Sequence, residues 1–152
     1  MFFFDSRRIK RLSLVLAVIL TAYIGSRASI DVSNDLWYTS LDKSDLNPPG
    51  YVFGIVWPIL YILMMISAFL SYEKIFIVFN IQLVLNAAWS WLFFKFQMPL
   101  VSLLDIYLLI ALNIFILTLM FKESKLAFLL FIPYVVWISF ASYLNLFIVI
   151  NN

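Results

Sequence analysis

Residues 100–121 have the sequence LVSLLDIYLLIALNIFILTLMF and contain a single charged side chain, Asp105. A transmembrane α-helix needs about 20 predominantly apolar residues to cross the hydrocarbon core of a bilayer. This stretch has that length and composition, and Pro99 and Lys122 flank it. It therefore predicts a membrane-spanning helix.

Four further segments share this character, at residues 12–30, 49–71, 75–94 and 126–150. Short polar breaks separate the last four spans, and such short connections make neighbouring helices antiparallel. The whole chain is 65% hydrophobic and 12% charged, whereas soluble domains are about 45–50% apolar and about 25% charged. We expect one domain over residues 1–152, an all-α membrane protein built as a bundle of five transmembrane helices.

The first long loop, residues 31–48, carries a small amphipathic stretch around Trp37 and Tyr38. This pattern predicts a short interfacial helix or a lid over one end of the bundle.

The first apolar segment has an alternative interpretation. Basic residues, an apolar run and the small-x-small sequence Ser26-Arg27-Ala28 also fit a secretory signal with its cleavage site. A retained span is the interpretation we favour, because Arg27 can extend its charged end to the interface.

Basic side chains predict the orientation of the bundle. Seven lie on the side of the N-terminus, namely Arg7, Arg8, Lys10, Arg11, Lys74, Lys122 and Lys125, against Arg27, Lys43 and Lys95 on the other. The positive-inside rule then predicts a multi-pass membrane protein with a cytoplasmic N-terminus, and an outward-facing long loop and C-terminus. A basic cluster beside an apolar segment is an orientation signal, and we expect no nucleic-acid partner.

Three spans each carry aromatic and amide side chains at helical spacing, on one face. These stripes are Trp57, Tyr61 and Met64; Gln82, Asn86 and Trp89; and Tyr134, Trp137, Ala141 and Asn145. Turned inward, they form a pocket suited to a large flat aromatic ligand. The alternative is that the amides hydrogen-bond between helices and the aromatic residues form interfacial belts. The three tryptophans lie at least a turn inside their spans, which weakens the belt explanation.

The residue inventory is poor for an enzyme. The chain has no His, no Cys and only three Gly, which excludes zinc sites, thiolate nucleophiles, a His general base and a Gly-rich phosphate loop. Asp105 is the one carboxylate well inside a span, and without a second acid we interpret it as structural rather than as a proton relay. We expect no catalytic residue, no metal site and no required cofactor. Any chemistry would come from the ligand, with light or oxygen, and from oxidisable Trp and Tyr.

A longer set of residues resembles the TspO/MBR family, which comprises the tryptophan-rich sensory proteins and the translocator protein, a peripheral-type benzodiazepine receptor. The resemblance runs in order and at family spacing from Trp37 to Asn145. It is carried by Trp37-Tyr38, Leu41, Lys43, Asn47-Pro48-Pro49, Val52-Phe53, Trp57, Leu60-Tyr61, Met64, Gln82-Leu83, Asn86, Trp89, Phe93-Phe94, Asp105, Pro133-Tyr134, Trp137, Phe140-Ala141 and Leu144-Asn145.

The resemblance implies a five-helix bundle that binds porphyrins, notably protoporphyrin IX, as sensor or carrier. It implies pocket positions at Tyr38, Trp57, Asn86, Trp137 and Ala141, with Gln82, Tyr61 and Trp89 as additions. A porphyrin-degrading enzyme that uses light and oxygen, and a small-molecule transporter, are the alternatives. Besides lipid and a tetrapyrrole or other flat hydrophobic molecule, we expect a homodimer as partner, because Ala87, Ala88 and Ser90 allow close helix approach.

The chain departs from the family pattern in two places. Ser44, Asp45 and Leu46 stand where the family has Pro and then an aromatic residue, which predicts a lid that closes differently. Residues 146–152 lack a Tyr followed by Lys or Arg, the segment associated with sterols, so sterol binding is not expected.

Overall fold

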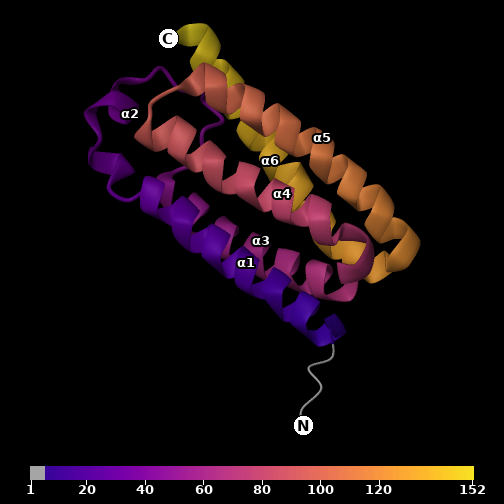
Figure 1. Ribbon diagram of the computed structural model, residues 1–152. Helices are drawn as coiled ribbons and strands as arrows, with labels where there is room; N and C mark the ends of the chain where they lie inside the picture. The colour runs from indigo at the N-terminus through magenta and orange to yellow at the C-terminus, as the bar shows by residue number, and fades with distance from the viewer. Residues whose placement is uncertain (1–5) are drawn as a thin grey trace.

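The computed structural model describes residues 6–152, and this part of the chain is a bundle of helices (Figure 1). The long helices are α1 (Ser6–Ala28), α3 (Gly50–Leu70), α4 (Tyr72–Ser90), α5 (Pro99–Glu123) and α6 (Lys125–Asn151). Between α1 and α3 lie a 3-10 turn, η1 (Val32–Asn34), and the short helix α2 (Leu36–Ser40). Five helical stretches in the described range are long and apolar enough to cross a membrane, which confirms the predicted fold class.

Short connections join consecutive helices, and each long helix packs against at least two others. One residue, Ser71, separates α3 from α4, and one, Ser124, separates α5 from α6. Ser124 also caps α6, because its hydroxyl accepts a hydrogen bond from the Ala127 backbone N–H at 3.2 Å. Helix α1 packs on α3 and α4, α4 on α5, α5 on α6, and α6 on α3. The core contains Phe79 and Phe131, while many Ile and Leu side chains face outward, as expected for a bundle in lipid.

Helix α1 differs from the expected first span, 12–30, at its start. It includes Ser6, the first described residue, and therefore the basic cluster. The guanidinium of Arg11 lies 5.0 Å from the ring centroid of Phe69 and 4.6 Å from that of Tyr72. These cation–π contacts hold the first turns of α1 against the α3–α4 corner, so the helix continues beyond the apolar segment.

The expected third span, 75–94, is divided in the structure. Helix α4 ends at Ser90, and the next five residues form a π-helical turn, η2 (Trp91–Lys95). The Phe96 backbone N–H donates to the Trp91 carbonyl at 2.8 Å, the wider i to i+5 pattern of a π-helix. Phe93 and Phe94 in this turn contact Trp37 and Tyr38 of α2. The turn thus anchors α2 as a lid at one end of the bundle (Figure 1).

Candidate functional site: a cavity beneath the lid

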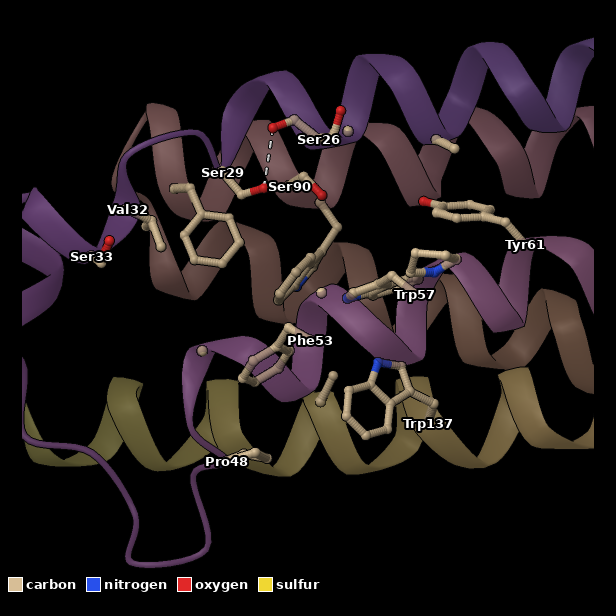
Figure 2. Close-up of a pocket in the computed structure, with 18 of the residues that line it drawn as sticks. Ser26, Ser29, Val32, Ser33, Pro48, Phe53, Trp57, Tyr61, Ser90 and Trp137 are labelled. Carbon is tan, nitrogen blue, oxygen red and sulfur yellow. Dashed lines mark hydrogen bonds between the residues drawn. The ribbon is translucent and has the colours of Figure 1, made fainter.

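A cavity of about 980 Å³ lies inside the bundle beneath the 32–50 segment. Its wall comes from α1, α3, the α4–η2 region and α6 (Figure 2). Ligand sites in proteins commonly measure about 300–1,000 Å³. The space is therefore large enough for a sizeable small molecule.

Aromatic rings make up much of the cavity wall. Trp57 stacks on Tyr61 with ring centroids 5.5 Å apart, one turn along α3. Trp137 of α6 meets Phe53 of α3 edge to face at 5.7 Å. Trp89 also lines the cavity. Figure 2 shows Trp57, Phe53 and Trp137 gathered around the same space. Such walls favour flat, aromatic ligands.

The indole nitrogens of two tryptophans differ in their bonding. Trp89 Nε1 donates to Asn145 Oδ1 at 3.1 Å, so this donor is used within the protein. Trp137 Nε1 is buried and has no hydrogen-bond partner, and in Figure 2 it lies on the edge of its ring nearest Trp57. A buried donor without a partner costs free energy. Because this nitrogen is buried, Trp137 lines the cavity with the other atoms of its side chain.

A chain of polar side chains lies behind the aromatic wall. The Tyr61 hydroxyl donates to Asn86 Oδ1 at 2.8 Å, and Asn86 Nδ2 donates to the Tyr134 hydroxyl at 2.8 Å. The Tyr134 hydroxyl in turn donates to Gln82 Oε1 at 3.0 Å. Gln82 Nε2 contacts Met64 Sδ at 3.6 Å. These groups satisfy one another, and they fix Tyr61 in the wall.

Six of the eight expected binding residues line the main cavity, namely Tyr38, Trp57, Tyr61, Trp89, Trp137 and Ala141. Gln82 and Asn86 do not. Gln82 is fully buried in the polar chain, and Asn86 reaches only a void of about 10 Å³ beside Trp57 and Trp89. The stripes therefore face inward, but their two amides support the wall of the main cavity rather than form it.

Helix α1 supplies a wall that the aromatic pattern did not reveal. Ala22, Gly25, Ser26 and Ser29 line the cavity. They stand at i, i+3, i+4 and i+7, a spacing that puts Ala22, Gly25 and Ser26 on one face of α1, with Ser29 just past its end. A stripe of small residues in the first span was the available signal, because small side chains leave the space that large rings elsewhere surround.

A hydrogen bond and a ring contact hold the lid against the bundle. The Ser44 and Tyr143 hydroxyls are 3.2 Å apart and hydrogen-bonded, so one of the residues that depart from the family pattern ties the loop to α6. Tyr38 packs on Phe94 with centroids 5.7 Å apart. Burial raises the pKa of the Tyr38 phenol, and a weaker opposing effect comes from a hydrogen bond with Asn47. The phenol is thus neutral at neutral pH.

Asp105 lies away from the cavity wall, half-buried in α5, and its Oδ2 is buried without a hydrogen-bond partner. Within residues 6–152, no three acidic side chains lie close enough together to hold a metal ion. The described site offers aromatic surface, hydroxyls and one basic side chain, Lys43.

Comparison with known proteins agrees with this architecture. A model of the TspO/MBR family matches residues 13–150. The chain is 36% identical to the tryptophan-rich protein TspO of Archaeoglobus fulgidus, over 95% of this chain and 97% of that protein. It is 34% identical to the uncharacterized membrane protein YtaB of Bacillus subtilis over 72% of this chain and 76% of that protein.

The human translocator protein is also similar, with 31% identity over 86% of this chain and 82% of that protein. The family model covers nearly all of the chain, and the relatives align along most of their own length. Five long apolar helices make the chain a multi-pass membrane protein. On these grounds the chain belongs to the TspO/MBR family.

Proposed function

We propose that this protein binds a porphyrin of the protoporphyrin IX type in the cavity beneath the lid, as a sensor or carrier. The observation that carries the proposal is the pair Trp57 and Trp137, which reach the same cavity from α3 and α6 (Figure 2). A tetrapyrrole is a broad flat ring, and offset or edge contacts with indole rings suit it.

Two further features support this function. The cavity volume of about 980 Å³ accommodates a large ring system. The wall also carries a few polar groups, among them the hydroxyls of Ser26 and Ser29 and the basic side chain of Lys43. Apolar walls with a few placed polar groups are the usual design of small-molecule sites.

Titration of the purified protein with protoporphyrin IX in the dark tests the proposal. We expect saturable quenching of Trp fluorescence together with a shift of the Soret band. Quenching that does not saturate, and that equals the quenching of a free tryptophan derivative in the same lipid or detergent, would contradict it.

Light-dependent degradation of the porphyrin is the second candidate function. Trp57, Trp89, Trp137 and Tyr61 are oxidisable and line the cavity. The same titration repeated under light and oxygen separates the two. Loss of the Soret band that requires the protein indicates an enzyme, whereas a stable band indicates binding alone.

A further inference from the structure

The charge of the cavity is concentrated in one side chain. Among the described residues that line it, Lys43 alone carries a formal charge. Lys43 belongs to the loop that follows α2, so its ammonium stands at the lid end of the cavity. The rest of the wall is apolar, aromatic or neutral and polar.

The ammonium of Lys43 is incompletely satisfied by the protein. It donates to the Leu41 carbonyl at 3.3 Å and lies 4.5 Å from the centroid of the Tyr38 ring. An ammonium has three N–H donors, and in the described part of the chain no carboxylate lies within ion-pairing distance of it. The neighbours in sequence, Asp42 and Asp45, are exposed and do not line the cavity.

The hydroxyls of Ser26 and Ser29 in the cavity wall are neutral, so they do not form an ion pair with Lys43. Ser29 Oγ donates to the Ser26 carbonyl at 3.2 Å, and Ser26 Oγ donates to the Tyr23 carbonyl at 2.8 Å. In Figure 2 these serines lie away from Tyr61, along the cavity toward the loop after α1. The site therefore has an aromatic body and one end that combines hydroxyls with a cation.

From this asymmetry we infer that Lys43 binds a carboxylate of the ligand and makes the site selective for anionic porphyrins over their neutral esters. This inference rests on the porphyrin-binding function proposed above. A flat ring with carboxylates along one edge can place its ring among the tryptophans and its carboxylate at the lid. A charge-assisted hydrogen bond in a partly desolvated site is stronger than a neutral one.

Comparison of protoporphyrin IX with its dimethyl ester tests the inference. Both ligands are titrated in the dark into the parent protein, Lys43→Gln and Lys43→Arg in lipid nanodiscs, following Trp fluorescence. For each variant the ratio of the two affinities is compared with that of the parent, which cancels the greater partitioning of the ester into lipid. Lys95→Gln is the matched control, because Lys95 is exposed and does not line the cavity.

We expect Lys43→Gln to lower the preference for the acid over the ester by about tenfold, through weaker binding of the acid. Lys43→Arg should keep most of the preference, and Lys95→Gln should equal the parent. An unchanged ratio in Lys43→Gln overturns the Lys43 inference and leaves porphyrin binding intact. Failure of the parent to bind either ligand overturns both.

Discussion

The Tyr61 hydroxyl donates a 2.8 Å hydrogen bond to Asn86 Oδ1 and thereby joins the wall of the cavity to the buried polar chain of α4 and α6. The relationship divides the expected binding residues into two roles. Tyr61 presents its ring to the cavity, whereas Asn86 and Gln82 hold that ring and Tyr134 in place. Their contribution to binding is then indirect, through the geometry of the wall.

Gln82→Leu tests this division. The substitution leaves Tyr134 without its acceptor at 3.0 Å, and we expect the free energy of unfolding to fall by about 1–3 kcal/mol. Affinity for protoporphyrin IX should change less than twofold, because Gln82 does not line the cavity. Denaturant unfolding and fluorescence titration measure the two effects. Gln97→Leu, at an exposed position, is the control, and unchanged stability with weakened binding would identify Gln82 as a direct ligand group.

Much of this site was accessible from the sequence because helical periodicity is a strong signal. The spacing of Trp57 and Tyr61, and that of Trp137 and Ala141, placed each pair on one face, and both pairs line the cavity. Spacing gives the direction of a side chain but not its depth. For that reason the pattern grouped Gln82 with the binding residues, although it lies fully buried behind them.

Other features depended on tertiary contacts that no local pattern records. The π-helical turn at residues 91–95 positions Phe93 against the lid, yet its sequence is an apolar run like any other. The start of α1 depends on Arg11 packing against rings of α3 and α4. The wall from α1 was not predicted because Gly25 and its small neighbours carry no aromatic ring or amide that would mark them.

Trp57 and Trp137, which line the cavity, should each contribute to binding, whereas Trp37 should not. Trp57→Phe and Trp137→Phe each keep an aromatic ring but lose ring area and the indole N–H. We expect several-fold weaker binding of protoporphyrin IX for each, since aromatic contacts contribute about 0.5–1.5 kcal/mol beyond area burial. Trp37→Phe is the control, because Trp37 packs on Phe93 and does not line the cavity. Parent-like titrations from both cavity variants would place the ligand elsewhere.

The orientation of the bundle can be measured directly. Five long helices bring the two ends of the described chain to opposite ends of the bundle (Figure 1), and the basic residues favour a cytoplasmic N-terminus. A reporter fused after Asn152 should therefore behave as external, and one inserted at Ser124 as cytoplasmic. A cytoplasmic signal from the first fusion contradicts the orientation.

Ligand binding should not require iron. The chain has no His or Cys, and the Tyr61 hydroxyl in the cavity wall already donates to Asn86. Haem iron would have only weaker ligands such as Tyr or Met, so metal-free protoporphyrin IX should bind at least as tightly as haem. Absorption titrations with both compounds measure this. Much tighter haem binding with a low-spin spectrum would show that an axial ligand exists.

Gly25 offers a way to fill the cavity from α1. A Cβ atom at this position would lie 3.5 Å from Ser90 Oγ and 3.8 Å from the Tyr61 hydroxyl, which are ordinary contacts. Gly25→Ala should therefore bind protoporphyrin IX within twofold of the parent and gain about 0.5–1 kcal/mol of stability from the lost glycine freedom. Gly25→Phe directs a ring into the space beside Tyr61, and we expect at least tenfold weaker binding. Ile24→Phe, one residue along on an exposed face outside the cavity, controls for added bulk on α1. Parent-like affinity in a folded Gly25→Phe protein would show that the ligand does not occupy this cavity.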